Sequence, residues 1–248
     1  MDAAQLVFFQ TREPALELFF CRDSRISYPR HTHAAHAAIG LILSGALLLD
    51  RAGAKTLCSA GSSFAIPPNT VHSFSASGPY TLLTVCIGRE LLQRRESAAQ
   101  ALRDAIRPPA LSGLLPPEGL FRLERALADL YSDLSELPEA APELAPIQAL
   151  LEMSPELSLS IRQLSRQAFC SPYHLIRRFQ LRTGLSPHSF QLQSRVRKAQ
   201  RLLGQTRTIA EAAQAAGFFD QSHLDRCFRR QVGITPSEYL RAQAVLSG

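Results

Sequence analysis

The sequence predicts an α+β fold in which a strand-rich N-terminal part precedes helices and an all-α C-terminal domain. Three observations support this prediction. Short apolar runs fill the first 88 residues, apolar residues at helical spacing follow them, and one helical motif occurs twice near the C-terminus. We expect a β-barrel at 1–88, a helical hairpin at 89–137, a linker at 138–143 and a domain with two helix-turn-helix motifs at 144–248.

The barrel prediction rests on apolar runs that are short and regularly interrupted. Turn-forming residues separate them, as at Ser44-Gly45 and Pro67-Pro68-Asn69. Many short strands with turns at short intervals are typical of a β-barrel or sandwich. The predicted strands are residues 6–9, 16–20, 37–43, 46–49, 55–58, 62–66, 71–74 and 80–87.

Helical spacing begins after residue 90. One apolar face runs from Leu91 to Ala105 and stops at Pro108-Pro109, and a second helix follows Pro116-Pro117. Leucines of the second helix recur at steps of three and four, which is the spacing of a coiled-coil seam. They are Leu120, Leu123, Leu127, Leu130, Leu134 and Leu137. The run is too short to decide between a dimer contact and packing within the chain.

Charge is distributed unevenly, although the net charge of the chain is only +6. Residues 155–248 carry 14 Lys and Arg against 5 Asp and Glu, a net charge of +9. Residues 1–154 carry 13 against 16, a net charge of −3. This asymmetry points to a polyanion partner for the C-terminal part, with a solvated basic surface as the alternative.

The N-terminus contains Asp2 and lacks a basic segment, so we expect no signal peptide. The five cysteines have an odd count and no CxxC spacing, which favours a reduced cytoplasmic setting. The longest apolar run, residues 37–49, has 13 residues and is too short to cross a membrane. We therefore expect a cytoplasmic protein with no membrane partner.

The C-terminal motif occurs in two copies whose residues match at an offset of 49 positions. The pairs are His174 and His223, Leu175 and Leu224, Arg177 and Arg226, Phe179 and Phe228, Gly184 and Gly233, Pro187 and Pro236, and Phe190 and Tyr239. Upstream the offset is 48, because the second copy has one extra turn residue near Gly217. The match indicates one structural unit used twice.

Each copy is interpreted as a short helix, a turn and a second helix with an apolar back, which is a helix-turn-helix. The second helices are expected at 172–183, with Ser171 as N-cap, and at 221–232, with Asp220 as N-cap. A helix at 190–203 lies between the copies and spans on the order of 20 Å. It can hold the two second helices apart for successive turns of the DNA major groove, which are about 34 Å apart.

With these motifs, residues 144–248 resemble the DNA-binding domain of the AraC/XylS family of bacterial transcription regulators. The resemblance is carried by S-P-Y-H-L-I-R-R-F and G-L-S-P in the first copy. In the second copy it is carried by A-G-F-F-D-Q-S-H-L-D-R-C-F-R-R and G-I-T-P-S-E-Y. It implies that the helices at 172–183 and 221–232 grip DNA and that the helix between them acts as a strut.

The outward faces of the two second helices give the candidate DNA-binding residues. They are Tyr173, Ile176, Arg177, Gln180, Gln221, Ser222, Asp225, Arg226 and Arg229. Arg suits guanine and Gln suits adenine, whereas Asp225 would accept from cytosine or orient Arg226. For each residue, contact with phosphate alone is the alternative. Other basic residues are assigned to phosphates or a solvated face: Arg178, Arg182, Arg195, Arg197, Lys198 and Arg230, with Arg229 a candidate for this role also.

Four N-terminal histidines, His31, His33, His36 and His72, are the candidate metal ligands. Residues 61–72 resemble the second cupin motif, so the N-terminal part resembles the cupin-type sensor barrel of many AraC/XylS regulators. The first cupin motif carries a glutamate, but here Ala37 and Ala38 lie where it is expected. A divalent transition metal and a small organic effector both stay open, and no cofactor is certain. Four aromatic residues could line an effector pocket or form plain core: Tyr28, Phe64, Phe74 and Tyr80.

The sequence therefore predicts a sequence-specific DNA-binding transcriptional regulator that responds to a small effector. We expect an activator that acts as a homodimer and recruits RNA polymerase, as the resemblance implies. The alternatives are a metal-responsive regulator and a cupin enzyme with a DNA-binding tail, both using the histidines. Because no Ser/His/Asp or paired-carboxylate arrangement is evident, we predict no catalytic residue and expect that the chain is not an enzyme.

Overall fold

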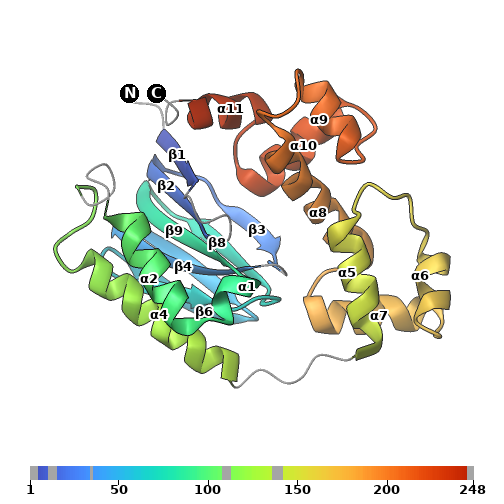
Figure 1. Cartoon of the computed structure of the whole chain (residues 1–248), viewed down its shortest axis with the longest axis horizontal. Coiled ribbons are helices and arrows are strands. Elements are labelled where there is room, and N and C mark those ends of the chain that lie inside the picture. Colours follow the sequence, from blue (N-terminus) through green and yellow to red (C-terminus); the bar gives the residue numbers. More distant parts are fainter. Residues whose placement is uncertain (1–4, 11–15, 34–35, 108–112, 136–141, 245–248) are drawn as a thin grey trace. The chain divides into compact units, whose positions relative to one another are not determined.

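The computed structural model describes residues 5–10, 16–33, 36–107, 113–135 and 142–244 (Figure 1). These residues form two compact units. The first contains the described residues up to 135 except 28–32, together with 242–244, and the second contains residues 28–32 and 142–241. Strands are confined to the N-terminal part and helices follow, so the predicted α+β class is confirmed.

The described strands form two sheets. The first has the order β1-β2-β9-β4-β7, made of β1 (Gln5–Gln10), β2 (Leu16–Ser24), β9 (Tyr80–Gly88), β4 (His36–Ser44) and β7 (Ser63–Ile66). The second has the order β3-β8-β5-β6, made of β3 (Tyr28–His31), β8 (His72–Ala76), β5 (Ala46–Arg51) and β6 (Ala54–Ser59). Paired strands run antiparallel, for example β4 with β9 and β5 with β6.

A closed barrel is not found among the described strands, which corrects the barrel prediction. Strands β4 and β5 lie on either side of the predicted turn at Ser44-Gly45, but they belong to different sheets and each pairs with other strands. Gly45 has a φ of +73°, and at this turn the chain passes from the first sheet into the second. Side-chain alternation is the same in a barrel and in two sheets, so the sequence pattern could not separate them.

Three helices cover the first sheet: α1 (Arg89–Leu92), α2 (Arg95–Ile106) and α4 (Gly119–Ser135). Apolar side chains of β2, β4 and β9 pack with them in one core. Leu123, Leu127 and Leu130 of the leucine run are buried in that core, and Leu120 and Leu134 pack against it. The run therefore packs within its own chain, while Leu137 lies outside the described residues.

Three of the four aromatic residues that could line an effector pocket, Phe64, Phe74 and Tyr80, are buried. The rings of Phe64 and Phe74 lie 5.2 Å apart and both are buried. A Cβ added at Gly40 would clash with the ring of Phe64. Tyr80 is fully buried and its hydroxyl donates to the carbonyl oxygen of Ile26 at 2.9 Å. These aromatic rings act as core.

The second unit is helical. Its elements are the 3-10 turn η1 (Pro142–Leu144), α5 (Ala145–Met153), α6 (Ile161–Gln167), α7 (Pro172–Thr183), α8 (Pro187–Leu202), α9 (Ile209–Ala215), α10 (Gln221–Val232) and α11 (Pro236–Ala244). Helices α6 and α7 form one helix-turn-helix, and α9 and α10 form the other. Both second helices have the predicted bounds, whereas α8 begins three residues earlier than predicted.

Local sequence explains these helix ends. Ser171 Oγ accepts a hydrogen bond from the backbone N–H of His174 at 3.3 Å, and Asp220 Oδ1 accepts one from His223 at 2.7 Å. Gly184 and Gly233 end α7 and α10 in the left-handed conformation, with φ of +69° and +86°. Among the described residues, no helix is long and apolar enough to cross a membrane.

Candidate nucleic-acid interface

Helix α7 presents four predicted DNA-binding residues to solvent. Leu175 and Phe179 are fully buried, and the ring of Phe179 meets that of Phe190 edge-on at 5.4 Å. Burial of this side points the opposite face outward. The exposed side chains on that face are Tyr173, Ile176, Arg177 and Gln180. Two of them are large and apolar, with Tyr173 67% and Ile176 37% exposed.

Helix α10 has the same construction with a more polar face. Leu224 and Phe228 are fully buried against Val196 and Ala199 of α8 and Ala212 of α9. The predicted readers Gln221, Ser222, Arg226 and Arg229 are exposed, and Asp225 is half-buried. Cys227 is half-buried on the inner side, where burial raises the pKa of its thiol. The thiol therefore stays protonated and serves packing.

Several basic residues assigned to phosphates are held by partners inside the second unit. Arg178 forms an ion pair with Glu143, and Arg182 Nε donates to Gln148 Oε1 at 2.9 Å. Arg195 donates to two backbone carbonyl oxygens, and Lys198 pairs with Glu156 at 2.7 Å.

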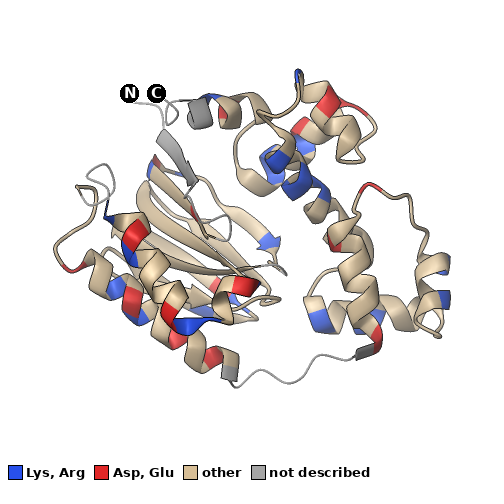
Figure 2. Cartoon of the chain, in the orientation of Figure 1, with Lys and Arg blue, Asp and Glu red and all other residues tan. Residues whose placement is uncertain are grey.

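The sequence could not reveal these partners, because they lie 34 or more positions away along the chain. Arg177, Arg226, Arg229 and Arg230 are exposed on the outer faces of α7 and α10. Figure 2 shows the Lys and Arg residues on the ribbons of α7, α8 and α10. These exposed arginines can neutralise the negative charge of phosphates in a DNA backbone.

Three of the predicted metal ligands lie close together. The ring centroids of His33 and His36 are 4.4 Å apart, and those of His33 and His72 are 5.0 Å apart. His33, His36 and His72 therefore lie near one another in the first unit, whereas His31 belongs to the second unit. Burial lowers the pKa of His31 to about 4, which keeps its ring neutral, as a metal ligand must be.

The histidine cluster fits a divalent metal only in part. Imidazole nitrogens suit zinc, copper, nickel and iron, and three such ligands leave a coordination position open. Ala37 and Ala38 are buried on β4, so this strand supplies no carboxylate where a cupin metal site would have one. The cluster can therefore offer a histidine-only site.

The first unit also contains a hollow that the sequence did not suggest. Its volume is about 430 Å³, within the size range of small-molecule sites. It is lined by Arg103, Ile106, Arg107, Leu115, Pro116, Pro117 and Leu120. Arg103 Nε donates to Glu124 at 2.6 Å, which fixes one guanidinium beside the apolar wall. Residues from α2 and the start of α4 meet only in the folded chain, so no local motif marks the hollow.

Two family models match the chain. The model of the AraC-like ligand binding domain matches residues 13–181, and that of a helix-turn-helix domain matches residues 164–242. The chain is 35% identical over 114 residues to an uncharacterized HTH-type transcriptional regulator, YbfI, of Bacillus subtilis, a match that covers 44% of this chain and 42% of the relative. It is 34% identical over 94 residues to the HTH-type transcriptional regulator MtrA of Neisseria gonorrhoeae, which covers 38% and 31%. The chain thus spans less than half the length of both curated relatives.

Solved structures of one protein, ToxT, share the fold over nearly the whole chain. The crystal structure of ToxT from Vibrio cholerae with a bound unsaturated fatty acid has a TM-score of 0.63 and covers 99% of each chain at 11% identity. A second crystal structure of ToxT has a TM-score of 0.61 and covers 92% of this chain at 13% identity. At this identity the likeness is one of fold.

Proposed function

We infer that this chain, which belongs to the AraC-like family of transcriptional regulators, binds DNA sequence-specifically and regulates transcription in response to a small effector. The observation that carries this proposal is the pair of helices α7 and α10. Each buries an apolar back and exposes side chains that can reach base edges. The family and the named relatives are transcriptional regulators, and the chain is not an enzyme.

The two reading helices are proposed to recognise different bases. Exposed Tyr173 and Ile176 on α7 offer apolar contact to thymine methyl groups, with Arg177 and Gln180 for guanine and adenine. On α10, Arg226 is proposed to bind guanine, and Asp225 to orient Arg226 or accept from cytosine. Gln221, Ser222 and Arg229 complete that face. The two halves of a DNA site should therefore differ in sequence.

The finer regulatory roles follow the family. We propose an activator that works in the cytoplasm, recruits RNA polymerase and acts as a homodimer. The dimer surface should lie outside the leucines of α4, because Leu123, Leu127 and Leu130 are already buried within the chain. Size-exclusion chromatography with light scattering would test it, and a monomer at high concentration would remove the dimer from the proposal.

The effector is proposed to be an apolar molecule with an anionic head, bound at the hollow between α2 and α4. Arg107 supplies positive charge there, since its ion pair with Asp104 is loose at 3.5 Å, whereas Arg103 is paired with Glu124. Ile106, Leu115 and Leu120 supply an apolar wall. The fatty acid bound by ToxT belongs to this chemical class. Oleate should raise the melting temperature of the wild-type chain and do so less with Arg107→Ala. No shift with wild type would refute this site.

A metal effector is the second candidate, favoured by the closeness of His33, His36 and His72. Zinc or nickel would be titrated into metal-free protein by calorimetry, alongside a His33→Ala and His72→Ala double variant. Binding near 1:1 that the double variant loses supports the metal candidate. Wild-type protein that binds neither ion would refute it.

The DNA proposal is tested with Arg226→Ala. Loss of a bidentate contact to one base should weaken specific binding by about 1–3 kcal/mol and relax one base preference. Fluorescence anisotropy with the specific site and with shuffled DNA measures both quantities. An equal loss of affinity for every DNA would indicate that Arg226 contacts a phosphate and not a base. Wild-type protein without any sequence preference would refute the proposed function.

A further inference from the structure

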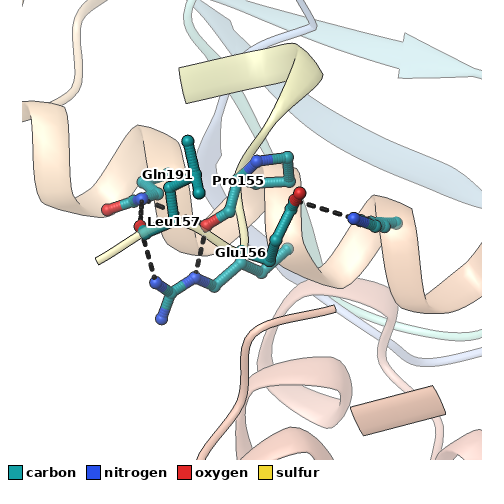
Figure 3. Close-up of polar contacts among 6 residues, drawn as sticks. Pro155, Glu156, Leu157 and Gln191 are labelled. Carbon is teal, nitrogen blue, oxygen red and sulfur yellow. Dashed lines mark hydrogen bonds and ion pairs between the residues drawn. The ribbon is translucent and has the colours of Figure 1, made fainter. Parts of the chain in front are cut away.

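The loop between α5 and α6 is tied to α8 by polar contacts (Figure 3). Gln191 Nε2 donates to the carbonyl oxygens of Pro155 and Leu157, at 3.0 and 2.7 Å. Arg195 donates to the same two oxygens, through Nε at 2.7 Å and Nη2 at 3.3 Å. Lys198 pairs with Glu156 at 2.7 Å. We call residues 155–157 together with Gln191, Arg195 and Lys198 the clamp.

Helix geometry and burial explain why Gln191 and Arg195 contact the same two carbonyl oxygens. Gln191 and Arg195 are four positions apart, so they project from the same side of α8. Gln191 and Pro155 are buried, and a buried carbonyl group needs a hydrogen-bond partner. Arg195 bridges two carbonyl oxygens at once, which a lysine with a single ammonium group cannot reproduce in the same geometry.

The second helix-turn-helix meets the clamp at Gly217. This glycine lies in the turn before α10 and has a φ of +87°. A Cβ added there would lie 2.5 Å from Glu156 Cα and 3.1 Å from Arg195 Nε. The backbone of the second motif therefore touches the clamp directly, because Gly217 has no side chain.

Helix α8 alone would not fix the two reading helices relative to each other. The first motif packs at its beginning, where Phe179 meets Phe190, and the second packs near its end around Val196 and Ala199. Rotation about the connections at either end of α8 would swing the motifs. Gln191 and Arg195 of the clamp lie between these two contacts along α8, and the clamp joins the chain that leads into α6 to the turn that leads into α10.

We propose that the clamp, with Arg195 as its positioning residue, sets the spacing between the two halves of the DNA site that this protein accepts. The proposal rests on the DNA-binding function above and adds a geometric rule to it. One extra base pair moves the second half-site by about 3.4 Å and turns it by about 35° around the helix axis. A rigid pair of readers cannot follow that change, whereas a loosened pair can.

The test compares affinities of the full chain for a selected DNA site and for the same site with one base pair added or removed between its halves. Wild-type protein should lose about tenfold or more in affinity when the spacing changes, as it would for a mismatched base. Arg195→Ala should bind all three DNAs with affinities within about threefold of one another. Lys198→Ala removes the ion pair with Glu156 but leaves the carbonyl contacts of Gln191 and Arg195, so it should have an intermediate preference and guards against misfolding of the first variant.

Arg201→Ala is the matched control, because Arg201 is an exposed arginine on α8 outside the clamp. It should lower all three affinities equally or not at all, so that the spacing preference stays at the wild-type value. A spacing preference that Arg195→Ala and Lys198→Ala leave unchanged would overturn the clamp, as would wild-type protein indifferent to spacing. Wild-type protein that binds no DNA sequence-specifically would instead refute the underlying function.

Discussion

Gly217→Ala should destabilise the second unit strongly, because Gly217 combines two constraints. Its φ of +87° lies in the region that residues with a Cβ avoid. The added methyl would also lie 2.5 Å from Glu156 Cα, a backbone atom that cannot rotate away. The substitution therefore strains the turn and pushes on the loop that α8 holds.

The magnitude follows from these two terms. A left-handed conformation costs a residue with a Cβ about 1–2 kcal/mol. Forcing a methyl into a filled space costs about 1–3 kcal/mol more. Alanine also lowers the conformational entropy of the unfolded chain, which stabilises the folded state by about 0.4–1 kcal/mol. The expected net loss is about 2–4 kcal/mol, a large part of the roughly 5–15 kcal/mol that stabilises a domain.

Gly53→Ala is a control that separates the cost of the left-handed backbone from the cost of the steric clash. Gly53 also has a positive φ, +94°, but nothing lies within 4 Å of an added Cβ. This control should cost only about 1 kcal/mol. Amide hydrogen exchange in peptides of each unit gives both unfolding free energies in the full chain. If Gly217→Ala costs no more than Gly53→Ala, the close approach to Glu156 is refuted.

Two further predictions concern salt and pH. The logarithm of DNA affinity should fall with the logarithm of salt concentration, with a slope of about −0.9 per phosphate neutralised. Arg230→Ala should make that slope less steep by about 1. An affinity that does not change with salt would contradict the basic interface. The backbone N–H and then the hydroxyl of Thr235 hold the pKa of Glu238 below its usual range. Glu238 thus stabilises the fold above its unfolded pKa of about 4.3, and this stability is lost as pH falls through the folded-state pKa. Urea unfolding should show a larger acid-induced loss for wild type than for Glu238→Gln, whose amide keeps the cap, and equal losses would contradict it.

Local signals predicted the helical unit well. The caps Ser171 and Asp220 and the terminating glycines Gly184 and Gly233 define α7 and α10 within a few neighbouring residues. Periodicity also placed Leu175 and Phe228 inside and Arg177 and Arg226 outside, because a helix has one buried side. Such information is contained in the local sequence.

Features that depend on distant contacts were not predictable in this way. Phe169 and Gly217 lie in the turns of the two motifs and both have a positive φ, but Phe169 is exposed, whereas a Cβ at Gly217 would meet the backbone of Glu156. Arg195 looked like a phosphate ligand because its carbonyl partners lie about 40 positions away. The same limit hid the passage of the chain between the two sheets at Gly45 and the hollow beside Arg107.

Selection of binding sites from random DNA by the full chain tests the central claim most directly. The account predicts an enriched site with two halves of unlike sequence, centred about 10–10.5 base pairs apart, one for α7 and one for α10. Pools that show no enriched sequence after repeated rounds would contradict it.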